Sequence, residues 1–143
     1  MSIIKKGSAI YHSLGKKGKA SVSTESGALS DQPYGFNTRF EEQVGTNPEE
    51  LIAAAHASCF TMALSFALEG EGYKEGQLKT EAAISLDKDG DGFTVTKSAL
   101  KLNAEVPEID GDEFERIAQT AKANCPISKL LNAEITLEYT LNS

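Results

Sequence analysis

The pattern of apolar and polar residues predicts a long helix near the middle of the chain. Asn47 can cap this helix, Pro48 suits its first turn, and Glu50 stands three residues after the cap. The residues that follow are apolar around almost the whole circumference as far as Leu68, and two glycines then end the run. Because such a helix is buried on most sides, we expect a sheet on one side and a second helix or a partner subunit on the others.

Alternating residues predict strands before and after this helix. Thr80–Leu86 and Gly92–Val106 flank the turn Asp87–Gly92, which is typical of a β-hairpin. The apolar set of the second strand changes phase, which predicts a bulge near Lys97–Ala99. Three further stretches also read as strands: Ile3–Tyr11, Lys19–Thr24 and Glu134–Leu141.

The segment between the hairpin and the last strand predicts two more helical pieces. Asp110 or Asp112 begins a helix with apolar residues on one face. Cys125 and Pro126 break that helix, and Pro126 then suits the first position of a further turn that reaches Leu131.

The stretch from residue 25 to residue 46 is rich in Gly, Ser, Asn and Pro, and we expect a long, functional loop there with short strands at most. The order of elements is then β-β-loop-α-β-β-α-α-β. This order predicts an α+β fold, and a chain of 143 residues suits a single domain over residues 1–143.

Composition narrows the classes of function and the compartment. The net charge of −7 disfavours nucleic acids and anionic membranes, since both attract basic surfaces. The first residues lack the apolar core of a signal peptide, and polar residues interrupt the most apolar stretch, so we expect neither an export signal nor a membrane span. We therefore expect a cytoplasmic protein whose two cysteines are reduced at rest, so that a disulfide between them would be transient.

Two metal sites are poorly supported by the sequence. Asp87, Asp89, Asp91 and Gly92 match the first half of a calcium loop, but the twelfth position is Ser98 where the site needs Glu. The flanking strands favour a hairpin turn instead. Zinc is also disfavoured, because the chain has only two His and two Cys and contains neither CxxC nor HxxxH.

The cysteines allow several interpretations from residue types alone. Cys59 lies in the apolar helix and is either core filler or a nucleophile. Cys125 precedes Pro126 and lies at or next to a helix cap, where the partial positive charge of the helix N-terminus would favour its thiolate. The two thiols could thus form a redox pair. His56 lies one helical turn before Cys59 and could instead serve a Cys-His hydrolase or acyl transferase, although a satisfied core histidine is the commoner case. A third interpretation is a binding module that holds an apolar ligand at a dimer interface.

Arg39 and Glu49 are the charged residues of interest. Arg39 lies between Phe36 and Phe40 just ahead of the long helix, and beside a thiol it would favour the thiolate; the alternative is an ordinary surface arginine. Glu49 suits a helix N-terminus on electrostatic grounds alone, but it could also orient Arg39 by a fork-to-fork contact. Direct contact of Glu49 with Cys59 is excluded, because ten residues of helix rise about 15 Å.

A family resemblance favours the redox interpretation. The stretch from Pro33 to Phe60, with Asn-Pro-Glu-Glu-Leu and Ala-Ser-Cys-Phe, resembles the osmotically inducible protein C (OsmC) family, sister to the organic hydroperoxide resistance (Ohr) proteins. The likeness continues through Asn124-Cys125-Pro126 and covers essentially the whole chain.

The resemblance implies a thiol-dependent peroxidase that reduces organic hydroperoxides, and hydrogen peroxide more weakly, in stress defence. Cys59 is similar to the peroxidatic cysteine, Cys125 to the resolving cysteine, and Glu49 to the family's glutamate. In the Ohr group the arginine comes from an early glycine-rich loop, where this chain has lysines only; the OsmC branch supplies its arginine from the later loop, so the resemblance points to Arg39.

The resemblance also implies antiparallel sheets packed around the long helix in an intertwined homodimer, with active sites at the subunit interface. It implies no metal or prosthetic cofactor, and an external dithiol of the lipoyl type as reductant. We expect a preference for alkyl hydroperoxides, because Phe60, Met62 and the loop aromatics would give Cys59 an apolar setting.

Overall fold

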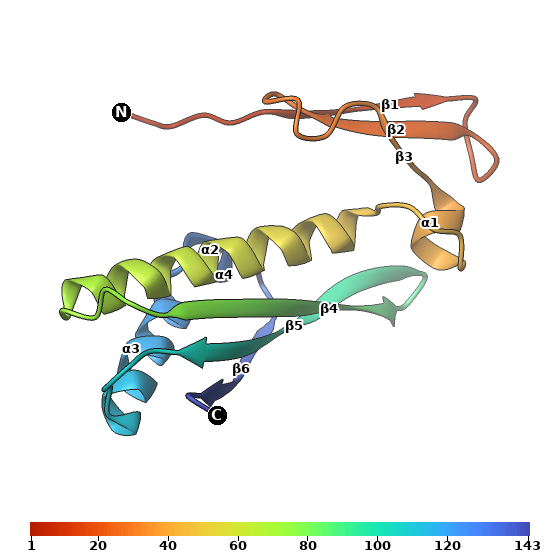
Figure 1. Ribbon diagram of the computed structural model, residues 1–143. Helices are drawn as coiled ribbons and strands as arrows, with labels where there is room; N and C mark the ends of the chain where they lie inside the picture. The colour runs from red at the N-terminus through yellow and green to blue at the C-terminus, as the bar shows by residue number, and fades with distance from the viewer. The chain divides into compact units, whose positions relative to one another are not determined.

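The structure, a computed structural model, describes residues 1–143. Its elements follow one another along the chain as Figure 1 shows. In order they are β1 (Gly7–His12), β2 (Lys19–Thr24), β3 (Gln32–Tyr34), α1 (Phe36–Phe40), α2 (Pro48–Gly70), β4 (Gln77–Asp89), β5 (Gly92–Glu105), α3 (Gly111–Asn124), α4 (Pro126–Leu130) and β6 (Glu134–Leu141). The predicted α+β class is confirmed.

The chain forms two compact units, Met1–Leu51 and Ile52–Ser143. The first unit contains an antiparallel sheet in the order β1-β2-β3. Val22 pairs with Ala9 on one side and with Gln32 on the other. The predicted strand Lys19–Thr24 has the predicted bounds, whereas the first strand begins at Gly7 and not at Ile3. That the whole chain is one domain stays a prediction.

The second unit contains a sheet in the order β4-β5-β6. β4 and β5 form the predicted hairpin, in which Gly90 takes the left-handed φ of 62°. Ser85 pairs with Lys97 but Leu86 pairs with Val95, so the bulge lies at Thr96, one residue before its predicted place. The sheet is not wholly antiparallel as predicted, since β6 runs parallel to β5; α3 and α4 supply the long crossover that a parallel pair requires.

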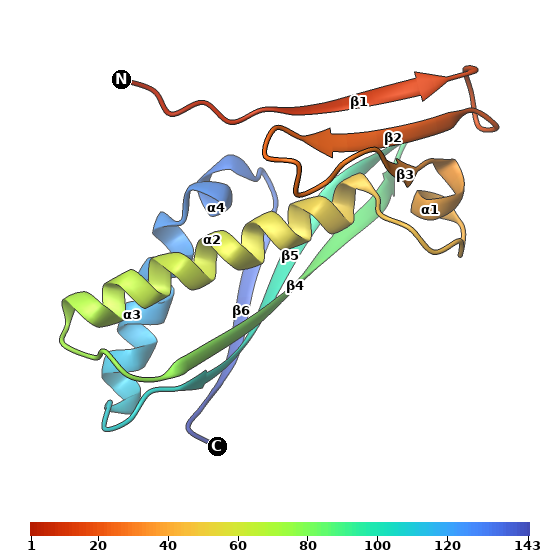
Figure 2. The same ribbon diagram turned by 45° about the horizontal axis from the view of Figure 1, so that its top comes forward.

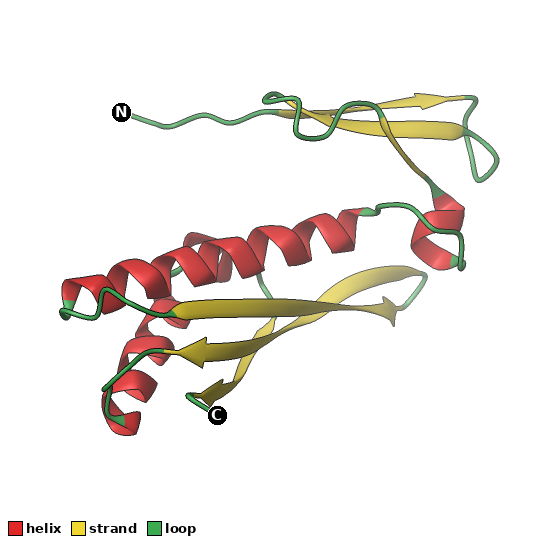
Figure 3. Ribbon diagram, viewed as in Figure 1, coloured by secondary structure: helices red, strands yellow, loops and turns green.

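The core of the second unit lies between this sheet and the helices α2 and α3 (Figure 2). The even-numbered residues of β5 from Ser98 to Ala104 are buried, and the odd-numbered residues from Lys101 to Glu105 are exposed. Phe60 from α2 and Phe114 from α3 belong to the same buried cluster, so both helices cover one face of the sheet. The opposite face is free of helices (Figure 3).

Local chemistry sets the ends of the helices as the sequence predicted. The backbone N–H of Glu50 donates to Asn47 Oδ1 at 2.8 Å, which caps α2. At the other end, Gly72 takes a left-handed φ of 99°, and Tyr73 N–H returns to Leu68 O at 3.0 Å. Asp110 caps α3 by accepting from two backbone N–H groups of its first turn.

Helix α1 was not predicted, because the sequence there reads as a loop. The helix has only five residues, two of them aromatic, and is too short to show a repeated apolar period. A side chain closes it: Thr38 Oγ1 accepts from Gly35 N–H at 2.9 Å and donates to Gly35 O at 3.1 Å. The short strand β3 agrees with the expectation that the stretch from residue 25 to residue 46 contains short strands at most.

The prediction that α2 is buried on most sides is wrong for the single chain. Its buried residues His56, Phe60, Leu64 and Leu68 lie along one face. Met62 and Phe66 point the other way and are 58% and 68% exposed.

The expectation that no stretch spans a membrane stays a prediction. By length and composition alone α2 could do so, with a mean hydropathy of 1.7. The core helices of soluble proteins pass the same test, so one such helix is weak evidence for a membrane span.

Candidate active site

The two cysteines form a pair in the second unit. Cys59 lies in the middle of α2 and is partly buried, while Cys125 is fully buried at the junction of α3 and α4. Its backbone N–H closes α3 on Ala121 O at 3.0 Å, and Pro126 opens α4 directly after it. Both thiols are free, and each lies close enough to shift the pKa of the other. The junction thus holds one thiol against the other.

The two thiols differ in how readily they ionise. Burial raises the pKa of Cys59, and its hydrogen bond with Cys125 raises it further. Burial also opposes ionisation of Cys125, but hydrogen bonds from Cys59, from the N–H and hydroxyl of Ser128 and from the backbone of Ile127 outweigh it and lower the pKa of Cys125. The two thiols titrate as a pair, and the surroundings of Cys59 within one chain disfavour its thiolate.

His56 is a buried residue with both ring nitrogens bonded. Its Nδ1 lies 2.6 Å from Ser98 Oγ on β5, and its Nε2 lies 2.8 Å from Ser128 Oγ on α4. Burial lowers the pKa of His56, so the ring is neutral near pH 7. No hydrogen bond joins the ring to Cys59, which favours the satisfied core histidine over the Cys-His nucleophile.

Arg39 and Glu49 form the predicted fork-to-fork contact in the first unit. Arg39 Nε donates to Glu49 Oε1 and Arg39 Nη2 donates to Glu49 Oε2, both at 2.8 Å. Arg39 ends the short helix α1, and Glu49 stands in the first turn of α2. The Glu49 hydrogen bonds raise the pKa of Arg39 despite a partial loss of hydration. Arg39 is therefore a fixed, oriented cation and not a freely moving surface arginine.

Aromatic rings surround this arginine. The guanidinium carbon of Arg39 lies 5.1 Å from the centre of the Phe40 ring. Lys16, from the early lysine-containing loop, holds its Nζ 4.8 Å from the centre of the Phe36 ring. With Tyr11 and Tyr34, these residues line a mainly apolar hollow of about 300 Å³. The hollow combines an apolar wall with two cations.

The predicted site residues thus form two pairs, one in each unit. Ten residues of α2, about 15 Å of rise, separate Glu49 from Cys59. Sequence reasoning missed Ser98 and Ser128. Ser98 could have been found from the sequence, because it is a polar residue at one of the alternating buried positions of β5. Ser128 could have been noted because it stands about one helical turn after Cys125.

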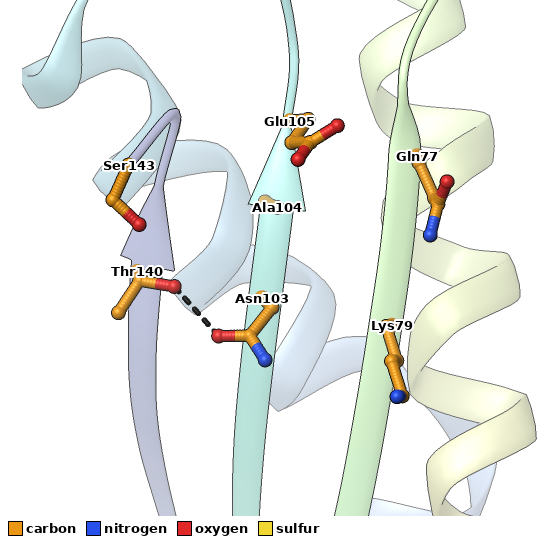
Figure 4. A pocket seen from close by; sticks show the side chains of 7 residues that line it. All are labelled: Gln77, Lys79, Asn103, Ala104, Glu105, Thr140 and Ser143. Atoms are coloured by element: carbon orange, nitrogen blue, oxygen red, sulfur yellow. Dashed lines mark hydrogen bonds between the residues drawn. The ribbon is translucent and has the colours of Figure 1, made fainter.

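Other polar clusters do not join these pairs. The side chains of Asp87 and Asp89 accept hydrogen bonds from Thr96 and Thr94 across the hairpin, as the turn interpretation predicts. No group of three or more His, Cys, Asp or Glu side chains is placed to hold a metal ion. The hollow of about 250 Å³ in Figure 4 is polar and lies at the exposed ends of the second sheet. Lys79 and Glu105 line it, but no cysteine, histidine or arginine does.

Comparison with known proteins identifies the family. Residues 40–140 match the family model described as OsmC-like protein. The chain is 57% identical to "Peroxiredoxin OsmC" of Escherichia coli (strain K12) over 143 residues, which is the full length of both.

Solved structures agree with this match. The organic hydroperoxide resistance protein OhrB of Bacillus subtilis matches with a TM-score of 0.70 and 27% identity, over 96% of this chain and 98% of that one. An OsmC-like protein of unknown function from Vibrio cholerae shares the fold with a TM-score of 0.73 at 18% identity, over 96% of this chain and 100% of that one.

Proposed function

Because this chain belongs to the OsmC-like protein family, we propose that it is a thiol-dependent peroxidase that reduces organic hydroperoxides with Cys59 and Cys125. The observation that carries this function is the pair of free thiols that lie close together at the junction of α2, α3 and α4. The names of its relatives, a peroxiredoxin and an organic hydroperoxide resistance protein, agree with it.

The reaction proceeds in two steps. The Cys59 thiolate attacks the distal oxygen of the hydroperoxide; the O–O bond breaks, an alcohol leaves, and Cys59 becomes a sulfenic acid. Cys125 then attacks the Cys59 sulfur, so that an S–S bond forms, the S–O bond breaks and water leaves. An external dithiol, of the lipoyl type by family resemblance, returns both cysteines to thiols by exchange.

Arg39 supplies the positive charge that Cys59 lacks. Burial and the Cys125 contact both raise the pKa of Cys59, so an unassisted Cys59 is a poor nucleophile near neutral pH. A cation beside it reverses this preference, and the Arg39–Glu49 fork is an oriented cation. Because about 15 Å of α2 separates Glu49 from Cys59 within one chain, we propose that the fork of a second copy of this chain lies beside Cys59 in the homodimer, where it favours the thiolate and holds the peroxide.

The preference for organic hydroperoxides rests on the aromatic hollow around Arg39. Phe60 and Met62, which the sequence suggested, do not serve it: Phe60 is fully buried in the core, and Met62 is exposed on the opposite side of α2. Tyr11, Tyr34 and Phe36 line the hollow instead. An alkyl group there loses contact with water, whereas hydrogen peroxide gains nothing from such a wall.

A homodimer with active sites at the interface is part of the proposal. The exposed apolar side of α2, with Met62 and Phe66, supports it, because monomeric soluble proteins rarely leave such a face in water. A reducing compartment such as the cytoplasm suits a thiol pair that must be reduced in every cycle.

Trapping of the sulfenic acid tests this function. The variant Cys125→Ser, treated with one equivalent of an alkyl hydroperoxide and then with dimedone, should carry one dimedone adduct on Cys59. The matched variant Cys59→Ser should carry none. Adducts on neither variant, or on Cys125 alone, would contradict the proposal and favour the binding module. Hydrolysis of an activated ester that is lost in Cys59→Ser but insensitive to peroxide would favour the hydrolase.

A further inference from the structure

The side chain of Asn47 makes two hydrogen bonds in opposite directions. Its Oδ1 accepts from the backbone N–H of Glu50 at 2.8 Å, which caps α2, and its Nδ2 donates to Thr38 O at 3.0 Å. A cap needs only the oxygen, and Ser or Asp would serve a helix start equally well. The amide nitrogen of Asn47 therefore makes a contact that capping does not require.

The two bonds hold the backbone next to each member of the Arg39–Glu49 fork. Thr38 directly precedes Arg39 near the end of α1, and Glu50 directly follows Glu49 in the first turn of α2. The loop that joins α1 to α2 contains neither helix nor strand (Figure 1). Asn47 closes this loop at its base, so one side chain ties the end of α1 to the start of α2.

The acceptor of the second bond is itself held in place. Thr38 is 9% exposed, and its Oγ1 bonds to both the N–H and the O of Gly35. Gly45 packs against the same residue, since a Cβ there would lie 2.8 Å from Thr38 Cγ2. The carbonyl that Asn47 contacts thus belongs to a closed turn, so the contact sets a defined distance between α1 and the first turn of α2.

The fork needs such a support. The side chain of Arg39 is 35% exposed, and that of Glu49 is 13% exposed. An ion pair this close to solvent contributes little free energy, because holding two long side chains in one geometry costs entropy. It therefore does not by itself fix the two backbone segments that carry it, and a displacement of about 1 Å at a reaction centre can cost about a hundredfold in rate.

We propose that Asn47 is a positioning residue, which fixes the Arg39–Glu49 fork in the orientation that presents the guanidinium to the peroxide and to the Cys59 sulfur. This inference rests on the proposed function and deepens its first step, the formation of the Cys59 sulfenic acid. Asn47 acts through Arg39 and Glu49 and not by contact with the reacting atoms. A residue that reads from the sequence only as a helix cap thereby also serves the chemistry.

Substitutions that keep the cap but remove the amide separate positioning from capping. Asn47→Ser caps well but is too short to reach Thr38 O, and Asn47→Asp keeps the shape but has no N–H to donate. In both variants the formation of Cys59 sulfenic acid should slow about tenfold, because a misplaced cation still stabilises the thiolate in part. The helix content by circular dichroism should stay unchanged. A wild-type rate in both variants would overturn the inference.

A double-mutant cycle separates this role from a general effect on the fold. In the Arg39→Met background Asn47→Ser should not slow the reaction further, because the group that Asn47 positions is gone. An equal loss in both backgrounds would overturn the inference. Asn37→Ser is the matched control: it removes another amide of the same segment, one that bonds to Gln43, and should leave the rate unchanged. A loss in this control equal to that in Asn47→Ser would also overturn the inference.

The Nε–H signal of Arg39 gives a readout that does not depend on peroxide. The chain has only two arginines, so ¹⁵N NMR shows two such signals, and Arg116→Met assigns them. Arg39 Nε donates to Glu49 Oε1 at 2.8 Å, so its hydrogen should be protected from exchange with water. Asn47→Ser should lose this protection and Asn37→Ser should keep it. Full protection in Asn47→Ser would overturn the inference.

These outcomes distinguish the inference from the function on which it rests. If the wild-type protein forms no Cys59 sulfenic acid, the proposed function fails and this inference fails with it. If Arg39→Met is slower than the wild type as expected, and Asn47→Ser reacts as fast as the wild type, only this inference fails.

Discussion

At the scale of single residues, the account depends on how a buried thiol becomes reactive. Cys59 is disfavoured as a thiolate by its own surroundings, and the fork that could reverse this lies on α1 and the first turn of α2. The fork has two parallel hydrogen bonds, so the charge and direction of the Arg39 guanidinium are both fixed. In the proposed mechanism, the reactivity of Cys59 therefore depends on both residue pairs.

Arg39 and Arg116 offer a matched test of this dependence, since they are the only arginines of the chain. Arg39→Met should slow the formation of Cys59 sulfenic acid about a hundredfold, the usual cost of removing one charge-stabilising donor at a reaction centre. Arg39→Lys should recover only part of the rate, because it lacks the fork. Stopped-flow measurement with excess alkyl hydroperoxide gives these rates.

Arg116→Met is the control for that measurement. Arg116 is exposed and contacts Glu71 by one hydrogen bond at 3.4 Å, so its loss should leave the rate unchanged. Equal rates for Arg39→Met and the wild type would contradict the role given to Arg39.

The residues of the site were predictable from sequence to different degrees. Asn47, Glu49 and Cys125 follow from local rules on caps and helix starts, which need no tertiary information. Ser128 and Ser98 do not, because their roles arise when α4 and β5 meet on either side of His56. The core role of His56 was favoured by the sequence, but its two partners were not.

At the scale of elements, His56 joins α2 to both β5 and α4 through its two ring nitrogens. The helices and strands themselves follow from periodicity and capping, which explains why α2, β2 and the hairpin were predicted well. The parallel pairing of β6 could not be predicted, because alternation gives the faces of a strand but not its neighbour. α1 was missed because a single side chain, Thr38, closes it.

The stability of the fold should depend on pH through the titration of His56. Burial lowers the pKa of His56 in the folded state, while the unfolded chain has a value of about 6.5. As the pH falls below about 6.5, His56 binds a proton in the unfolded chain but stays neutral in the folded chain. The free energy of unfolding therefore decreases. Urea unfolding under reducing conditions should show a loss of up to about 1 kcal/mol between about pH 7 and pH 5.5.

His56→Gln should flatten that dependence, whereas His12→Gln should keep it. A slope that disappears with His12 and persists without His56 would contradict the assignment of the pH effect to the buried ring.

At the scale of the whole molecule, the main difference between the sequence-based prediction and the structure of the single chain concerns the burial of α2. Its composition predicts burial on most sides, but one chain covers only the face of Phe60 and Leu64. Phe66 and Met62 stay exposed, and the proposed homodimer would cover them. The sequence predicts that another surface packs on this side of α2, but it does not identify that surface.

A charge on that face should disrupt the dimer. Phe66→Asp should weaken association by at least about a hundredfold, because an unpaired charge would be buried in the interface. Ala83→Asp adds the same charge on the exposed face of β4 and should have no such effect. Sedimentation equilibrium measures both, and a wild-type protein that is monomeric at micromolar concentrations would refute the dimer.

The central claim is that Cys59 and Cys125 are one redox pair, and the intact mass of the oxidised protein tests it most directly. After one equivalent of an alkyl hydroperoxide under non-reducing conditions, the chain should lose the mass of two hydrogen atoms, and proteolysis should yield one peptide pair linked through Cys59 and Cys125. A dithiol should reverse the change. An unchanged mass, or a chain that only gains oxygen without the link, would contradict the account.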